Sequence, residues 1–241
     1  MFAVTCMVNI LYNTIISQLK EKDKLYILGD VIDRGPDGIK ILQDIMKRKE
    51  KGQIEFLIGN HELMMVQSLF LNNDKQKQIW TSNNNLGDIT LKEFEKLNSD
   101  EQNKIKEFLL DSYVCKNINV NSQKVHLVHA KSIQERNDNS NKTLREMLAE
   151  GKENLIEDAV WSRSSDGKKP HEKSAKNGIF TVIGHSPTDD NMIKYRNGYL
   201  NIDCGCAGME TASLVNLTKG VVKYFNVMRE NIKTFSKNKG R

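Results

Sequence analysis

The chain has 241 residues, of which 38% are hydrophobic and 28% are charged, a composition typical of one large globular domain or of one core with a helical insertion. The formal charge is +5, but +4 of it lies in residues 229–241, where five Lys or Arg stand against one Glu. We expect this basic tail to be a frayed, solvated end. No basic patch with interleaved aromatic residues accompanies it, which argues against nucleic-acid binding.

The uncharged N-terminal stretch and the cysteines bear on location. The first 19 residues lack a basic start and a small-residue cleavage site, and Asn9 and Asn13 interrupt the apolar run. We therefore expect neither a signal peptide nor a transmembrane helix. Four cysteines in a chain of this length do not indicate a disulfide framework, and Cys204 and Cys206 lack a second pair for a zinc site. The expected location is cytoplasmic, with reduced cysteines and no membrane partner.

Short apolar runs bounded by turn residues predict buried strands in the first quarter of the chain. Residues 2–5 form the first run, and a helix is expected to follow it to about residue 20. Residues 25–28 (LYIL) and 54–58 (IEFLI) form the next two, and apolar side chains between 39 and 46 repeat at helical spacing. This is a strand–helix–strand unit, and ligands bind at the carboxyl ends of such parallel strands.

The middle of the chain, residues 63–121, is polar with helical spacing, and we expect a helical cap there beside the strand ends. Residues 99–102 have the form of a capping box. Residues 164–178 are a loop by composition. Further strands are expected at residues 125–128, 180–183, 199–202, 212–217 and 221–227, the last two forming a hairpin. The predicted organisation is one domain over residues 1–228 that contains the cap, followed by the basic tail.

Four of these apolar strands end in side chains that bind metal ions. In chain order they are Asp30, Asn60 followed by His61, His129 and His185. A carboxylate, an amide oxygen and imidazoles suit a borderline divalent ion such as Mn, Fe or Zn. A carboxylate can also bridge two ions, and two ions can clamp a phosphoryl group and generate a hydroxide nucleophile. One such residue would indicate little, but four in succession predict a metal centre.

Five short motifs occur in the order GDVIDRG, GNHE, a strand-terminal HA, WSR and GHSP. Together they resemble the phosphoprotein-phosphatase branch of the calcineurin-like metallophosphoesterases, above all the bacterial and phage Ser/Thr protein phosphatases and the related hydrolases of dinucleoside polyphosphates. The segment from Trp80 to Leu91 resembles the same bacterial group. The resemblance covers about residues 23–210 and implies an α/β fold, in which helices flank a β-sandwich core and a helical cap is inserted.

The resemblance implies a role in metal binding for each strand-end ligand. Asp30 would be the bridging carboxylate between two divalent ions, and Asn60, His129 and His185 would complete the second metal site. Manganese is the favoured ion, with iron and zinc as alternatives.

The same resemblance implies the acid and the phosphate ligands. His61 would protonate the leaving alkoxide, and Asp33 would hold its ring. Arg34 and Arg163 would bind the phosphate oxygens, a role that suits the planar guanidinium fork. Attack would be direct, by a metal-bound hydroxide, with no covalent phosphoenzyme.

One family feature is missing from this sequence. The family carries an Asp-x-His-Gly motif after its first strand, which supplies an Asp and a His to the first metal. Here the equivalent stretch is VTCMVNILY, so that Cys6 and Val8 replace the two ligands in one register, and Met7 and Asn9 in another. Three interpretations stay open: an active phosphatase with an unusual or weak first metal site, a catalytically impaired protein that binds phosphorylated partners, or a native N-terminus that differs.

The sequence thus predicts a metal-dependent phosphomonoester hydrolase that resembles Ser/Thr protein phosphatases. The expected partners are phosphoprotein or small phosphoester substrates. The main alternative is hydrolysis of dinucleoside polyphosphates, since the cap decides between an open groove and a nucleotide pocket.

Overall fold

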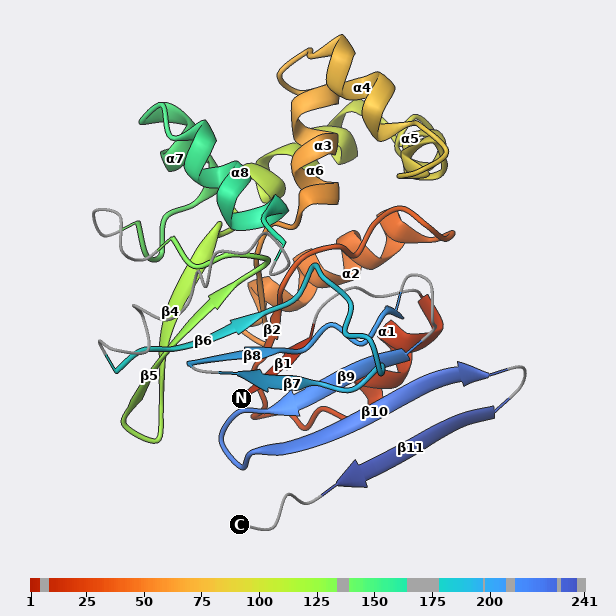
Figure 1. Ribbon diagram of the computed structural model, residues 1–241. Helices are drawn as coiled ribbons and strands as arrows, with labels where there is room; N and C mark the ends of the chain where they lie inside the picture. The colour runs from red at the N-terminus through yellow and green to blue at the C-terminus, as the bar shows by residue number, and fades with distance from the viewer. Residues whose placement is uncertain are drawn as a thin grey trace.

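The computed structural model describes residues 1–4, 9–133, 139–163, 178–196, 198–206, 211–228 and 231–237. Its described strands form two mixed sheets, with the orders β11-β10-β9-β1-β2-β3 and β4-β5-β6-β8-β7 (Figure 1). The strands are β1 (Phe2–Val4), β2 (Leu25–Ile27), β3 (Ile54–Phe56), β4 (Cys115–Val120), β5 (Gln123–Val128), β6 (Phe180–Ile183), β7 (Lys194–Arg196), β8 (Tyr199–Asn201), β9 (Thr211–Asn216), β10 (Val221–Met228) and β11 (Asn231–Lys237).

Helices cover the sheets, and α3 to α8 gather on one side of them (Figure 1). The helices are α1 (Asn9–Ser17), α2 (Gly38–Glu50), α3 (Asn60–Leu69), α4 (Asp74–Trp80), α5 (Gly87–Phe94), α6 (Ser99–Leu110), α7 (Leu144–Ala149) and α8 (Glu153–Trp161). None of the helices described is long and apolar enough to cross a membrane. The predicted α/β fold, a β-sandwich flanked by helices, is confirmed.

Side-chain alternation along the strands builds two cores. Ala3, Tyr26 and Leu28 point into the space between the sheets, where they meet residues of β5 and β6 such as Leu127 and Val182. The alternate residues of the same strands, including Val4, Leu25 and Ile27, pack instead against the helices. Both faces of this sheet are therefore buried, which explains why its central strands are continuous apolar runs.

The predicted parallel strands are confirmed, and they fix where the loops meet. β2 pairs in parallel with both β1 and β3, and β6 pairs in parallel with both β5 and β8. The predicted closing hairpin is also present, as the antiparallel pair β9 and β10. The carboxyl ends of β2, β3, β5 and β6 consequently face one region between the sheets and the helices α3 and α8.

The structure corrects several predicted elements. β4 lies within residues 63–121, where we expected a helical cap, and the described cap helices end at Leu110. A two-residue turn joins β4 to β5, with positive φ at both Asn121 (48°) and Ser122 (66°), as in a type I′ turn. This Asn-Ser pair is a weaker hairpin signal than Asn-Gly, and the polar residues of β4 made the strand resemble a helix. β7 was also missed.

Two element ends also differ from expectation. The capping box of α6 consists of Asn98 and Glu101, one residue before the expected position, with Asn98 Oδ1 accepting the Glu101 N–H at 3.0 Å. Residues 231–237, expected within a frayed tail, form β11, which pairs antiparallel with β10. The predicted loop at 164–178 falls outside the described residues, except for Gly178, as do Cys6, Met7 and Val8.

Candidate metal centre

Each proposed ligand comes within four residues of the end of a parallel strand. Asp30 comes after β2, Asn60 begins α3 a short turn beyond β3, and His129 and His185 follow β5 and β6. The Gly184 N–H donates to the His129 carbonyl at 2.7 Å, which ties the ends of β5 and β6 together. The structure therefore brings the four predicted metal ligands together from both sheets.

Two glycines allow the first two of these strand ends to touch. A Cβ atom on Gly29 would lie 2.3 Å from the backbone nitrogen of Gly59, and Gly29 also has a φ of +82°. A Cβ atom on Gly59 would lie 2.3 Å from Asp30 Oδ1. Real Cβ atoms do not approach other atoms so closely. The contact between the two strand ends therefore requires glycine at both position 29 and position 59.

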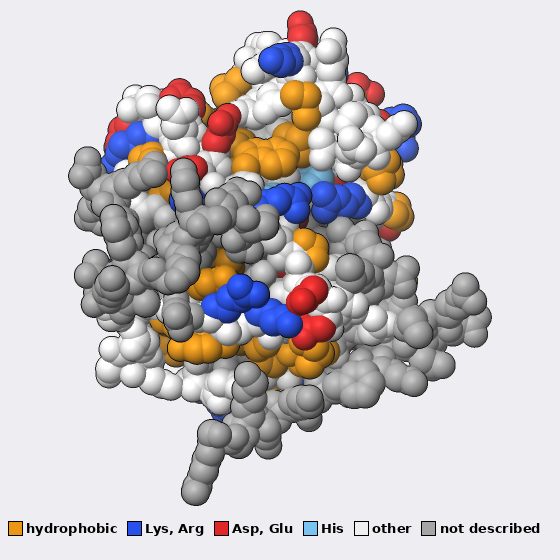
Figure 2. All heavy atoms as spheres, in the orientation of Figure 1, with side chains coloured by type: hydrophobic (Ala, Val, Ile, Leu, Met, Phe, Trp, Pro, Cys, Tyr) orange, Lys and Arg blue, Asp and Glu red, His pale blue; other side chains and the backbone are white. Residues whose placement is uncertain are grey.

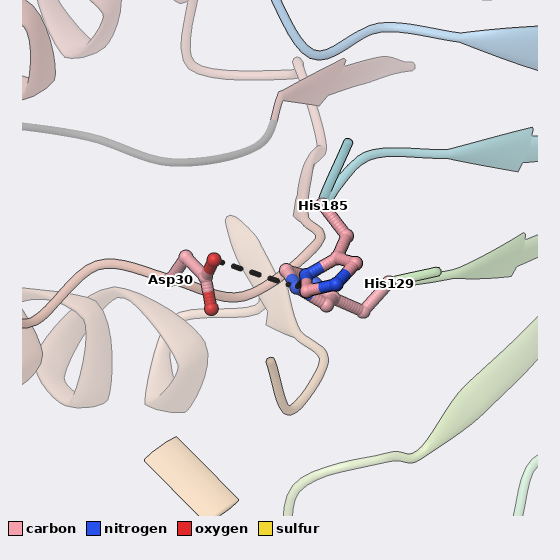
Figure 3. Close-up of side chains that lie close together, drawn as sticks. All are labelled: Asp30, His129 and His185. Carbon is pink, nitrogen blue, oxygen red and sulfur yellow. Dashed lines mark hydrogen bonds and ion pairs between the residues drawn. The ribbon is translucent and has the colours of Figure 1, made fainter. Parts of the chain in front are cut away.

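The side chains of Asp30, His129 and His185 lie close together (Figure 3), and the Asn60 amide joins them. Asn60 Oδ1 lies 3.1 Å from His129 Nε2 and 3.0 Å from His185 Nδ1. His129 Nε2 lies 3.3 Å from His185 Nδ1 and 3.4 Å from Asp30 Oδ2. Within the described residues, Asp30, His129 and His185 form the group of His, Cys, Asp or Glu side chains able to hold a metal ion.

The hydrogen bonds on the far side of each imidazole show that the cluster fits a cation. His129 Nδ1 contacts the Leu28 carbonyl, and His185 Nε2 lies 3.1 Å from the Trp161 carbonyl. A carbonyl can only accept, so both outer nitrogens carry the proton, and neutral rings then direct their lone pairs inward. The atoms that face the centre are then all acceptors: two imidazole nitrogens, an amide oxygen and a carboxylate oxygen. None can donate a proton to another, but all four are suitable ligands for a divalent ion.

The charges of the cluster shift its pKa values in different directions. Burial opposes ionisation of Asp30, but the nearby His129 and His61 outweigh this and lower the pKa of the carboxyl. Burial also opposes a charge on His129, yet Asp30 raises its pKa. Burial lowers the pKa of His185 to about 3, and the charges of His129 and Arg163 act in the same direction. The site therefore keeps an ionised carboxylate beside a neutral His185.

His61 occupies the next position on α3 and is oriented by Asp33. Its Nδ1 lies 2.6 Å from Asp33 Oδ2, and its backbone N–H donates to Asp30 Oδ1 at 3.3 Å. Its Nε2 is buried and has no hydrogen-bond partner among the described residues. An imidazole nitrogen in this position is usually paired. The Nε2 atom therefore faces a group that the described part of the protein does not itself supply.

Comparison with known proteins identifies the group to which this site belongs. Residues 10–211 match the model of the family described as calcineurin-like phosphoesterase. The chain belongs to that family. Metallophosphoesterases bind divalent metals, and the cluster of Asp30, His129 and His185 is able to bind one. The identity of the family confirms the resemblance that the sequence motifs indicated.

Individual relatives of this metallophosphoesterase are distant. A symmetrical bis(5'-nucleosyl)-tetraphosphatase of Buchnera aphidicola subsp. Acyrthosiphon pisum (strain 5A) is 37% identical over 46 residues, which are 19% of this chain and 16% of that relative. The cold-active protein-tyrosine phosphatase of Shewanella sp. is similar in structure, with a TM-score of 0.55 at 16% identity, covering 97% of this chain and 79% of that one. A Saccharomyces cerevisiae protein serine/threonine phosphatase has a TM-score of 0.52 at 10% identity, and the match covers 100% of this chain and 80% of the yeast chain. These structures show a shared fold.

Two exposed arginines lie near this metallophosphoesterase centre. Arg34 follows Asp33, and its charge acts on the buried Asp203, where it partly offsets the rise in pKa that burial causes. Arg163 follows α8, and its charge acts on His185. The surface view shows Lys and Arg side chains next to a small patch of exposed histidine (Figure 2). The two arginines predicted to bind phosphate are thus exposed near the buried cluster.

Glu62, a buried neighbour, supports the centre from behind. Its carboxylate accepts the backbone N–H groups of Gly59 (2.9 Å), Asp30 (2.9 Å) and Val31 (2.8 Å). Asp30 has a left-handed φ of 59°, a strained conformation that this carboxylate holds in place. Glu62 therefore sets the geometry of the metal ligand without joining the cluster itself.

The position of Asn9 bears on the missing Asp-x-His motif. Its amide nitrogen donates to Asp37 Oδ2 at 2.8 Å, and its amide oxygen accepts from Asn13 at 2.6 Å. Both polar atoms of Asn9 are thus hydrogen-bonded to residues outside the cluster of Asp30, His129 and His185. The other residues considered for the missing ligand positions, Cys6, Met7 and Val8, lie outside the described residues.

Proposed function

We propose that the protein is a metal-dependent phosphomonoester hydrolase, and that phosphoserine or phosphothreonine proteins are its substrates. The observation that carries this proposal is the unpaired His61 Nε2, buried beside the four-ligand cluster. A proton donor held next to a cation site is what departure of an alkoxide from phosphorus requires. The assignment of all eight predicted site residues is part of this proposal.

His61 would donate its Nε2 proton to the leaving oxygen. The short contact of Nδ1 with Asp33 fixes the orientation of the ring, as a carboxylate does for a catalytic imidazole. The bond from the His61 backbone to Asp30 keeps the acid in register with the metal ligands. The proton donor and the cation site are thereby parts of one connected structure.

Arg34 and Arg163 would bind the phosphate oxygens from the surface side of the centre. Both arginines are exposed, and each guanidinium offers planar pairs of N–H donors. Arg34 is close enough to Asp203, and Arg163 to His185, for its charge to shift the pKa of that residue. A divalent ion held by Asp30, Asn60, His129 and His185 would act as a Lewis acid on a phosphoryl oxygen and lower the pKa of coordinated water. We favour manganese, and a cytoplasmic location belongs to the same proposal.

Two other functions use the same residues. Hydrolysis of dinucleoside polyphosphates is favoured by the 46-residue match to the symmetrical tetraphosphatase, although that match covers 16% of the relative. A phosphate-binding protein without turnover is favoured by the missing Asp-x-His motif, because loss of one of two ions commonly removes several kcal/mol of transition-state stabilisation. All three functions require the same metal cluster.

Turnover and metal content test the proposal together. Elemental analysis would count bound metal, and phenyl phosphate, whose poor leaving group needs a proton, would measure hydrolysis with added Mn²⁺ by the wild type, His61→Gln and the control His126→Gln. His126 is a buried histidine on β5 that contacts Asn117 at 2.8 Å instead of the cluster. We expect loss of turnover in His61→Gln alone.

The outcomes separate the three functions. Faster hydrolysis of a phosphoserine peptide than of diadenosine tetraphosphate supports a protein phosphatase, and the reverse supports the dinucleotide hydrolase. A phosphate-binding protein is supported by two results together: metal is bound without turnover, and Arg34→Ala abolishes the binding of phosphate. Absence of bound metal under all conditions would contradict all three.

A further inference from the structure

We propose that Trp80 and Thr90 are positioning residues for the proton donor, and that they make the helical cap part of the acid machinery. Trp80 ends α4 and Thr90 lies in α5. Both act through Asp33, which in turn orients His61. This inference rests on the proposed function, and it adds two residues of the cap that lie outside the five short motifs.

The Asp33 carboxylate is held on both oxygens. Oδ2 accepts the Trp80 indole N–H at 2.8 Å and also faces His61 Nδ1 at 2.6 Å. Oδ1 accepts the Thr90 hydroxyl at 2.6 Å. With three donors around a carboxylate that is shielded from solvent, rotation about its side chain would break at least one hydrogen bond in a place where water cannot replace it.

Thr90 also holds the backbone of Asp33. The Asp33 N–H donates to Thr90 Oγ1 at 3.0 Å, so a single hydroxyl accepts from the backbone and donates to the side chain of the same residue. Asp33 has a φ of 66°, in the left-handed region that non-glycine residues seldom adopt. Such conformations persist where the surroundings determine them, and Thr90 supplies that constraint.

Packing of the cap explains the spacing of Trp80, Gly87 and Thr90. The Trp80 side chain is fully buried, and a Cβ atom on Gly87 would lie 2.4 Å from its indole nitrogen. Only glycine leaves room for the ring that reaches Asp33. One helical turn beyond Thr90, Glu93 accepts the backbone N–H groups of Asp37 (2.6 Å) and Ile39 (3.1 Å), which docks α5 on the start of α2.

The dependence of the rate on the leaving group tests this positioning. Phenyl phosphate has a poor leaving group that needs the proton from His61, whereas p-nitrophenyl phosphate has a good one that needs it far less. In Trp80→Phe and Thr90→Val we expect kcat for phenyl phosphate to fall about ten- to a hundredfold, part of the roughly 10²–10⁴-fold effect of a general acid. The rate on p-nitrophenyl phosphate should change much less.

Two matched variants separate positioning from general damage. Thr90→Ser keeps the hydroxyl and should restore the rate on phenyl phosphate. Lys92→Ala changes an exposed side chain on the same helix and should leave the rates on both substrates unchanged. Equal loss on both substrates in Trp80→Phe and Thr90→Val, or no loss on either, would overturn the inference.

A second measurement keeps the inference testable if the wild type hydrolyses neither substrate, an outcome that would count against the proposed function alone. The chain has five histidines, so ¹⁵N-histidine NMR can resolve the Nδ1–H proton of His61, assigned with His61→Gln. We expect Trp80→Phe and Thr90→Val to broaden or abolish this signal by faster exchange with water, and Thr90→Ser to retain it. An unchanged signal in the first two variants would overturn the positioning role.

Discussion

The Nε2 atom of His129 lies 3.3 Å from Nδ1 of His185, and the opposite nitrogen of each ring contacts a backbone carbonyl. The two rings come from different strands of the second sheet, and the carbonyls belong to Leu28 and Trp161. This arrangement fixes both tautomers before any metal binds. The protein has therefore positioned two ring nitrogens where one divalent cation can bind both.

Divalent metal should consequently stabilise the folded protein. At a free Mn²⁺ concentration of 100 times its Kd, the free energy of unfolding should rise by about 2.7 kcal/mol if the unfolded chain does not bind the ion. Thermal melts with and without Mn²⁺ would measure this. His185→Asn should lose most of the increment, and His126→Gln should keep it. An equal increment in all three proteins would place the ion elsewhere.

Gly59→Ala should disrupt the metal centre. The new methyl group would overlap Asp30 Oδ1 and lie 2.9 Å from Glu62 Oε2, so both carboxylates must move. We expect weaker Mn²⁺ binding by isothermal titration calorimetry. Gly52→Ala is the control, because its Cβ meets nothing within 4 Å and its φ of +72° brings only backbone strain, about 1–2 kcal/mol. Unchanged metal affinity in Gly59→Ala would contradict the proposed contact.

Glu93→Ala should destabilise the protein through the start of α2. Asp37 precedes this helix but makes no capping bond with its side chain, and Glu93 from α5 supplies the acceptor instead. Loss of a helix cap costs about 0.5–2 kcal/mol, which a urea titration would detect. Lys92→Ala, an exposed change on the same helix, should stay within about 0.5 kcal/mol. Similar values for the two variants would show that Glu93 does not act as a cap.

Alkaline pH should weaken the fold through Cys204. Burial raises the pKa of this thiol to about 12, whereas an exposed cysteine titrates near about 8.5. The unfolded chain therefore ionises first, so this contribution to stability is complete below about pH 8.5 and is lost as the pH rises towards 12. By pH 10 the loss is about 2 kcal/mol.

Urea titrations of the wild type and Cys204→Ala between pH 8 and pH 10 would measure this contribution. The variant should be less stable at pH 8 because it lacks a buried side chain, but its stability should fall less steeply with pH. Parallel slopes would contradict a buried, neutral thiol.

The parts of the site that the sequence predicted depend on local chemistry. Asp30, Asn60, His129 and His185 each follow an apolar run, and parallel strands necessarily present their ends to one region. The bounds of β6 and the closing hairpin were likewise readable, because period, apolar composition and turn residues act over a few positions. The sequence did not predict β4, because its polar residues and its Asn121-Ser122 turn carry only a weak local signal for a strand and a hairpin.

By itself the sequence determined the fold class and the family, and it named candidate ligands for a metal centre, because these follow from short motifs at strand ends. Only the tertiary structure decided how those residues are held. The tautomers of His129 and His185 are set by carbonyls of Leu28 and Trp161, and Asp33 is fixed by Trp80 and Thr90, which lie 47 and 57 residues away in the chain. Contacts at such separations arise from packing of the cap on the core, which no local pattern of side chains encodes.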